Sequence, residues 1–321
     1  MGFENENSEL QTNYERLSSV NKVEGGTEEE QKKVSDNLDE EFLTEKLYKN
    51  EEREKTPEEK EIINAVITEL NDFLSKYDAK PLNLKDTHIH ILDKSKMSEK
   101  SIDYFEKYCQ TSSGYYQQEN QDVIVLGWKI ISPLELARVI SHELIHFLSF
   151  NSVVIDKKNK DGFTLHRVGL AVQPQHEEIQ PSGPKYFNEI NEAVTEELVK
   201  RFYDRLKNIP LLTEEYEDLI KTREKYSVPD LAAISMEEVD TPDGIVYKAN
   251  IKKYAYPKLR KNLNAFIKDI YEKRQNDFDS EEEIFEIFVK AAMTGDVKEL
   301  ATLVDSTLGS GTFKKIAQPN D

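Results

Sequence analysis

The chain has 321 residues, of which 37% are hydrophobic and 33% charged, so it can build one large domain or two modest ones. Its formal net charge is −19, which excludes nucleic acid and anionic membranes as favoured partners because phosphate would repel it. The single cysteine, Cys109, rules out an intrachain disulfide. The N-terminus lacks the basic start and apolar core of a secretory signal, and no stretch could span a bilayer, so we expect a cytoplasmic protein.

Residues 1–56 have the composition of an acidic, disordered leader, because acids outnumber bases and large apolar residues are sparse. The next residues, Thr-Pro-Glu-Glu at 56–59, have the pattern of a capped helix start, and apolar residues then recur at helical spacing to about Tyr77. We therefore expect an ordered α+β subdomain over 57–186 and a helical C-terminal subdomain over 187–321.

Between residues 87 and 206 the sequence alternates between strand-like and helical segments. Strands are predicted from period-two or β-branched runs and helices from apolar spacing and caps, at 87–92 (strand), 101–109 (helix), 121–126 (strand), 132–148 (helix), 163–172 (strand) and 188–206 (helix). His88 and His90 would share one face of their strand. Because no third ligand is evident near them, we interpret them as exposed side chains on an edge strand.

The helix at 132–148 carries the pentapeptide His142-Glu-Leu-Ile-His146. Residues four apart lie on one helix face, one turn from each other, so two imidazoles in this pattern can bind one Zn²⁺. Glu143 projects beside such a metal ion, where it can take a proton from water. The rest of the helix is mostly apolar. Metal ligation is favoured over a plain polar face because unpartnered polar groups would be costly there.

A catalytic zinc ion needs a third protein ligand and one open position. The residues after His146 lack the glycine and third histidine of a metzincin, so that class is excluded. The segment Asn191-Glu-Ala-Val-Thr-Glu196 offers two acids four apart on a second helix. Glu192 could complete a His₂Glu set, and Glu196 could orient an imidazole through its free N–H. Without the histidines, these acids would read as the polar face of an ordinary helix.

Together, HELIH and NEAVTE resemble the gluzincin metallopeptidases, the thermolysin-like group, whose pattern is HExxH followed by a helix with NExxx(D/E). The resemblance implies that Glu192 is the third zinc ligand and that Glu196 supports His142. Residues 167–170 (RVGL) are also similar to the compact bacterial minigluzincins. The implied fold is zincin-like: a small mixed sheet on the active-site helix, then a mostly helical subdomain.

The match covers residues 120–205, about a quarter of the chain. The separation of 46 positions between His146 and Glu192 exceeds that in thermolysin, so substrate specificity does not transfer.

The resemblance also implies an activity, the hydrolysis of peptide bonds in a peptide or protein substrate, with Zn²⁺ as cofactor and Glu143 as general base. Tyr186 is the expected hydrogen-bond donor to the oxyanion, because toxin-like gluzincins place a tyrosine in that neighbourhood. Its rivals for that role are His166, Arg167, His176 and Tyr203. The segment 121–126 is expected to be the edge strand along which an extended substrate pairs.

Two alternatives remain open at this stage. One is a catalytically silent zinc domain that binds a partner, although Glu143 would then have no purpose beside the metal. The other is a latent peptidase restrained by its acidic leader. The sequence leaves the substrate, the choice between endo- and exopeptidase action, and the oligomeric state undetermined.

Overall fold

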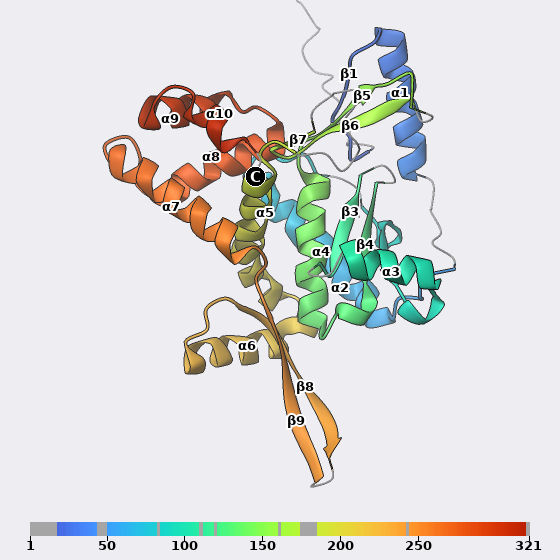
Figure 1. Ribbon diagram of the computed structural model, residues 1–321. Coiled ribbons are helices and arrows are strands. Elements are labelled where there is room, and N and C mark those ends of the chain that lie inside the picture. The colour runs from blue at the N-terminus through green and yellow to red at the C-terminus, as the bar shows by residue number, and fades with distance from the viewer. Residues whose placement is uncertain are drawn as a thin grey trace, which may run out of the picture.

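The computed structural model describes residues 18–43, 50–81, 84–108, 112–118, 121–159, 162–173, 185–241 and 244–318 (Figure 1). The α-helices are α1 (Glu28–Leu43), α2 (Pro57–Ser75), α3 (Glu99–Tyr108), α4 (Pro133–Leu148), α5 (Asn188–Phe202), α6 (Thr213–Tyr226), α7 (Pro257–Lys273), α8 (Glu281–Thr294), α9 (Lys298–Leu308) and α10 (Thr312–Ile316). The strands are β1 (Lys22–Glu24), β2 (Ile89–Leu92), β3 (Gly114–Gln117), β4 (Asp122–Leu126), β5 (Asn151–Ile155), β6 (Phe163–Val168), β7 (Ala171–Val172), β8 (Leu231–Thr241) and β9 (Gly244–Lys253). The fold is therefore of the α+β class.

Helix α4 lies at the centre of the molecule, with α2 and the sheet that contains β3 and β4 on one side and α5 on the other (Figure 1). It begins as the sequence predicts: the Ser132 hydroxyl accepts a hydrogen bond from the Glu135 N–H, and Pro133 occupies the first turn. Every residue from Leu134 to Leu148 is buried. The predicted start of α2 is also confirmed, with Thr56 and Glu59 forming a reciprocal capping box.

The sheet beside α4 has the strand order β2-β4-β3, with β2 parallel and β3 antiparallel to β4. Strand β4 is thus paired along both edges, and all of its residues are buried. The prediction that residues 121–126 form an edge strand open to substrate is therefore wrong. A continuous β-branched run is typical of a central strand whose two faces are both covered, and β4 is such a strand. The edge strand of this sheet that lies next to α4 is β3.

A second sheet, of order β1-β5-β6-β7, contains part of the segment predicted as leader. Strand β1 pairs with β5, and α1 buries Val34 and Leu38 against Val153 and Phe163. The expectation of disorder over 1–56 is therefore wrong for residues 18–43, because sparse apolar residues at helical spacing suffice when a neighbouring sheet covers them. Residues 1–17 and 44–49 lie outside the described residues.

The described residues of the predicted C-terminal subdomain, 187–241 and 244–318, are helical except for the β8–β9 hairpin, which extends away from the helices in Figure 1. The prediction of a helical subdomain missed it, although Pro242-Asp243-Gly244 between two alternating runs is a hairpin signal. The largest hydrophobic cluster includes α2, α4, α5, α7, α8 and α9. The two predicted subdomains consequently share one core.

Candidate metal centre

The predicted ligands His142, His146 and Glu192 come together where α4 contacts α5. The two Nε2 atoms of the histidines are 3.3 Å apart. Oε2 of Glu192 is 3.5 Å from Nε2 of His142 and 3.5 Å from Nε2 of His146. Three potential donor atoms therefore form a nearly equilateral triangle.

The size of this triangle fits a zinc ion. With metal–ligand bonds of about 2.1 Å, the ligand atoms of a tetrahedral site stand about 3.4 Å apart. The three donor atoms are one carboxylate oxygen and two imidazole nitrogens, a set that suits zinc, and a three-residue set leaves the fourth position of a tetrahedron for water or substrate. The residues present therefore fit the ion that the sequence motif implies.

Each histidine is oriented from behind by a residue of α5. Nδ1 of His142 lies 2.7 Å from Oε2 of Glu196, and Nδ1 of His146 lies 3.5 Å from the side-chain nitrogen of Asn191. Both rings consequently turn Nε2 toward Glu192. The Glu196 carboxylate can accept the Nδ1–H of His142, which fixes that ring and raises its basicity, whereas the Asn191 amide nitrogen is a donor and contributes only to the position of the His146 ring. The supporting role predicted for Glu196 agrees with this geometry.

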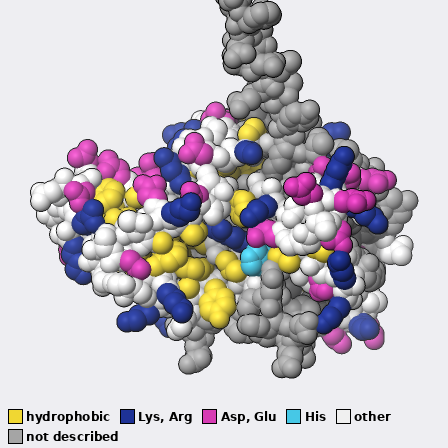
Figure 2. All heavy atoms as spheres, turned by 90° about the horizontal axis from the view of Figure 1, so that it is seen from above, with side chains coloured by type: hydrophobic (Ala, Val, Ile, Leu, Met, Phe, Trp, Pro, Cys, Tyr) yellow, Lys and Arg dark blue, Asp and Glu magenta, His cyan; other side chains and the backbone are white. Residues whose placement is uncertain are grey.

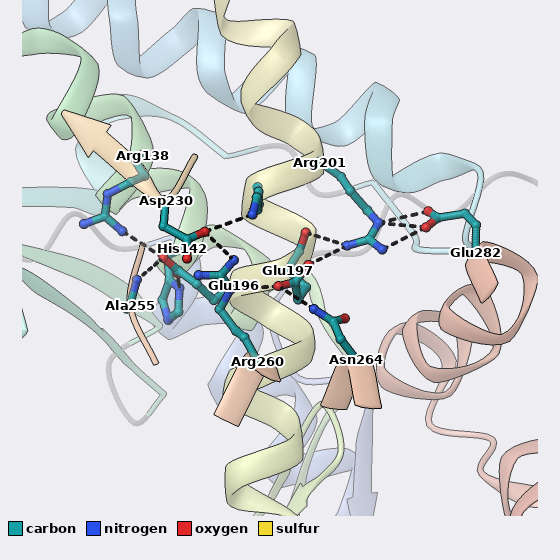
Figure 3. Close-up of polar contacts among 11 residues, drawn as sticks. Arg138, His142, Glu196, Glu197, Arg201, Asp230, Ala255, Arg260, Asn264 and Glu282 are labelled. Atoms are coloured by element: carbon teal, nitrogen blue, oxygen red, sulfur yellow. Dashed lines mark hydrogen bonds and ion pairs between the residues drawn. The ribbon is translucent and has the colours of Figure 1, made fainter. Parts of the chain in front are cut away.

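Glu196 is itself held by several groups (Figure 3). Its Oε1 accepts hydrogen bonds from the Ala255 N–H at 2.6 Å and from Arg138 at 3.3 Å. Burial alone would raise the pKa of Glu196, but the bond to His142, together with the charges of His142 and Arg138, lowers it to about 2. The carboxylate therefore stays ionised and fixed behind the imidazole.

The charges around the cluster favour a cation. Burial would lower the pKa of His142, but hydrogen bonds to Glu192 and Glu196 and the nearby charge of Glu143 raise it to about 10. Burial would likewise raise the pKa of Glu192, yet the charge of His146 and the bonds to both rings hold it well below its usual range. Three carboxylates facing two imidazoles demand positive charge, which a divalent ion can supply in place of protons.

Glu197, which follows Glu196 on α5, connects that helix to α7 and α8 (Figure 3). Its carboxylate accepts bonds from Arg260 of α7 at 2.8 Å and from Arg201 at 3.0 Å, and Arg201 also binds Glu282 of α8. Glu197 and Arg260 are both buried. This network of charged hydrogen bonds restrains α5, and with it Glu192 and Glu196.

Glu143, the predicted general base, is buried on α4 and faces strand β3. Burial raises its pKa, although the charges of His142 and His146 and a hydrogen bond from the Tyr116 N–H oppose that shift. Strand β3 approaches closely because residue 114 is glycine: a Cβ there would lie 2.8 Å from Val139 and 3.3 Å from the Glu143 side chain. A carboxylate with a raised pKa beside the ligands suits a proton carrier.

Tyr256 is a site residue that the sequence did not suggest. Its ring centroid lies 6.1 Å from that of His142, and its hydroxyl is hydrogen-bonded to Glu192. The Tyr256 side chain is 39% exposed, and its partial burial together with the charges of Glu192 and Glu143 raises its pKa, so it remains a phenol that can donate. Its backbone is left-handed (φ +50°), held between Ala255, which binds Glu196, and Pro257 at the start of α7. Such strain is typical of functional positions.

Tyr186 lies two residues before α5, with its side chain 42% exposed and its backbone paired with Val172 of β7. Its role as oxyanion donor stays a prediction. Among its rivals, Tyr203 is buried and donates to the Ala232 carbonyl, and Arg167 binds the Gly169 and Gly295 carbonyls. These two are used in packing. His166 lies in β6, and His176 lies outside the described residues.

Other supporting residues could have been found from spacing. Arg138 stands one helical turn before His142, and Asn191 directly precedes Glu192 within the motif. Residues 167–170 (RVGL) help to position Asn191, because the Leu170 N–H donates a hydrogen bond to the Asn191 side-chain oxygen at 2.8 Å. Gly169 (φ +58°) allows this approach, since a Cβ there would lie 2.4 Å from the Asn191 oxygen. Tyr256 left no such signal.

Comparisons with known proteins identify no relative. No family model matches the chain, no curated protein matches it, and no solved structure matches it. Across the parts of the chain that the structure describes, every helix is too short or too polar to cross a bilayer. On the face seen in Figure 2, hydrophobic side chains gather between patches of acidic and basic side chains, so neither sign of charge dominates that face.

Proposed function

We propose that this chain is a zinc-dependent peptidase with a zincin-like fold, of the gluzincin type. The observation that carries the proposal is the donor triangle of His142, His146 and Glu192, with edges of 3.3 to 3.5 Å, beside the buried carboxylate of Glu143. A metal-binding site without catalysis would need the triangle only. The additional carboxylate beside it favours hydrolysis.

The proposed chemistry assigns one task to each residue. When bound, the metal ion would polarise the scissile carbonyl and acidify a water molecule. Glu143 takes the proton of the attacking water and delivers it to the leaving amine, which its raised pKa assists. Glu196 and Asn191 keep the two imidazoles oriented. Tyr256 replaces Tyr186 as our proposed donor to the developing oxyanion, because its phenol already lies beside Glu192.

Strand β3 takes over the substrate-binding role first assigned to residues 121–126. The Leu126 N–H donates to Ser113, so in this antiparallel ladder residues 113, 115 and 117 bond β4 while Gly114 and Tyr116 direct their backbone groups away from it. The Tyr116 N–H points to Glu143. An extended peptide paired along this side of β3 would lie next to the general base.

The test pairs metal analysis with a digest of a proteome-derived peptide library. The wild-type protein should bind one equivalent of zinc and cleave peptides. Glu143→Gln should keep the zinc and lose about 10²–10⁴-fold in turnover, because only the proton carrier is removed. His146→Ala should lose both. Cleavage by Glu143→Gln at a normal rate would reject the mechanism, and full zinc occupancy without any cleavage would favour a silent partner-binding domain.

A second candidate, a peptidase restrained by its N-terminal segment, has one supporting observation. The Ser19 hydroxyl accepts a hydrogen bond from the Tyr116 hydroxyl on β3 at 2.9 Å, and both the Ser19 N–H and its hydroxyl donate to Gln121. The segment thus contacts the strand proposed to hold the substrate. If it restrains β3, Ser19→Ala should raise turnover at unchanged zinc content. Unchanged or lower turnover would reject this form of latency.

A further inference from the structure

The β8–β9 hairpin has an unusual surface for a projecting arm. Beyond its buried base at residues 231–233, it extends for about eight residues, or about 25 Å. Met236, Ile245, Tyr247 and Ile251 are each between 55% and 63% exposed. Two-stranded hairpins are marginally stable by themselves, and exposed apolar side chains gathered on one indicate a binding surface.

These side chains lie on one face of the hairpin. In an antiparallel pair, directly opposite residues share a face, and here Met236 opposes Ala249, Ile234 opposes Ile251, and Glu238 opposes Tyr247. The hydrogen bond from the Tyr247 hydroxyl to Glu238, at 2.9 Å, confirms this register. We call this apolar side, formed by residues 234, 236, 238, 245, 247, 249 and 251, the stripe. The opposite face is more polar: it has Ser235 opposite Asn250 and Glu237 opposite Lys248, with one apolar pair, Val239 opposite Val246.

The charges of the hairpin are separated along its length and between its strands. Over 231–241 and 244–253 there are three acids (Glu237, Glu238, Asp240) and three lysines (Lys248, Lys252, Lys253), so the two strands have no net charge, and Asp243 between them gives the hairpin a net charge of −1. The acids lie on β8 toward the tip. Two of the lysines lie at the base of β9, and strand alternation puts Lys253 on the side of the stripe.

We propose that the stripe is the contact surface of a two-fold dimer in which the hairpins of two copies of this chain pack face to face and antiparallel. In that arrangement Glu238 near the tip of one hairpin approaches Lys253 at the base of the other, and the apolar side chains of both stripes are covered. If the two hairpins instead paired edge to edge through the same strand, the acids of one β8 would face those of the other β8, or the lysines of one β9 would face those of the other β9. The charge pattern therefore selects the face-to-face, tip-to-base arrangement.

The length of the arm keeps the acidic remainders of the two chains far enough apart to limit their electrostatic repulsion. Tip-to-base packing separates the bodies by about one arm length, about 25 Å, whereas charges are screened over about 8 Å at physiological salt. The covered area, about 400 Å² per copy, is below the usual 800 Å² of a stable complex. The dimer should therefore be weak, with dissociation in the micromolar range or above.

The test is sedimentation equilibrium of the full-length chain over about a hundredfold range of concentration. Neighbouring residues offer a matched pair of variants: Ile245 lies on the stripe and Val246 on the opposite face, and both are β-branched and exposed. Ile245→Glu should raise the dimer dissociation constant at least tenfold, and Val246→Glu should leave it within about twofold. Circular dichroism of both variants checks that the fold is intact.

A charge exchange tests the antiparallel arrangement. Lys253→Glu and Glu238→Lys should each weaken the dimer several-fold, and the double variant should restore it because each reversed charge again meets its opposite across the interface. A wild-type chain that stays monomeric at every concentration would overturn the proposal, as would equal effects of Ile245→Glu and Val246→Glu. A monomer that cosediments with zwitterionic lipid vesicles would assign the stripe to a lipid surface instead.

Discussion

At the scale of single residues, the ligand triangle depends on groups behind it as much as on the ligands. Glu196 is fully buried and binds His142, Arg138 and the Ala255 N–H, so it connects α4, α5 and the segment before α7. Asn191 connects His146 to the turn at Gly169 and Leu170. Each imidazole is therefore held at two points, by its own helix and by α5.

Removal of the charge behind His142 should weaken metal binding. We expect Glu196→Gln to lower zinc affinity by about 10–100-fold, because the imidazole loses its ionic partner while the side-chain shape is kept. Competition with a chromogenic chelator measures this affinity. The matched variant Glu192→Gln, which changes a ligand itself, should have the larger effect. Equal affinity of Glu196→Gln and wild type would contradict the supporting role.

The two tyrosine candidates can be separated by kinetics. Tyr256→Phe should lower kcat by about 10²–10³-fold with little change in KM, because a donor that acts on the oxyanion works in the transition state. Tyr186→Phe should change kcat by less than about threefold, because Tyr256 rather than Tyr186 is the tyrosine hydrogen-bonded to the ligand Glu192. Steady-state rates on one cleaved library peptide give both values. The reverse ranking would restore Tyr186 to the role predicted from sequence.

At the scale of elements, strand β2 is joined to the segment at residues 50–53 by a partly buried ion pair between His90 and Glu52. His90 is 1% exposed, with Nδ1 2.8 Å from Glu52 and Nε2 3.5 Å from Asp122. His88 lies in the preceding 3₁₀ turn, where its ring stacks on Phe42. The expectation that both histidines share an exposed strand face is therefore wrong, because the strand begins only at Ile89.

The pair should make stability depend on pH. Burial would lower the pKa of His90, but Asp122 and Glu52 raise it; burial would raise the pKa of Glu52, but His90 lowers it. The histidine contribution is complete below its unfolded pKa of about 6.5 and is lost as pH rises through the raised folded value. The Glu52 contribution is complete above about pH 4.5 and is lost as pH falls through its lowered value.

His90→Gln should therefore destabilise the fold by about 2 kcal/mol at pH 6 and by less at pH 9. Urea unfolding at both pH values measures the difference. A double-mutant cycle with Glu52→Gln should give a coupling energy that decreases over the same interval. A coupling energy that grows with pH would show that the pair is not ionic.

At the scale of the whole molecule, the N-terminal elements are part of the fold. Leu38 and Phe42 of α1 are 1% and 5% exposed, and Gln121, fully buried, donates to the Leu38 carbonyl at 2.7 Å. The Asn21 and Asn151 backbones are also joined. The N-terminal segment and the central sheet therefore form one structural unit over the residues described.

A chain that begins at Thr56 should consequently be less stable. Loss of the buried side chains of Val34, Leu38 and Phe42 should cost about 5–9 kcal/mol, from about 1.5–3 kcal/mol each. Urea unfolding of this chain and of one that begins at Ser18 measures the loss, since the second keeps β1 and α1. Equal stability of the two would mean that these elements contribute nothing to the core.

The sequence by itself determined the local features of this protein. Caps at Thr56 and Ser132 determine where α2 and α4 begin, and the four-residue spacing of His142 and His146 places both imidazoles on one face, because helix geometry is set by neighbouring residues. Only the tertiary structure decided which distant groups meet them. It brought Glu192 and Glu196, which the NEAVTE motif had already indicated, to the two imidazoles, placed Tyr256 beside the ligands, paired β4 on both edges and covered α1. Such choices depend on packing between elements far apart in the chain, and no local pattern records that packing.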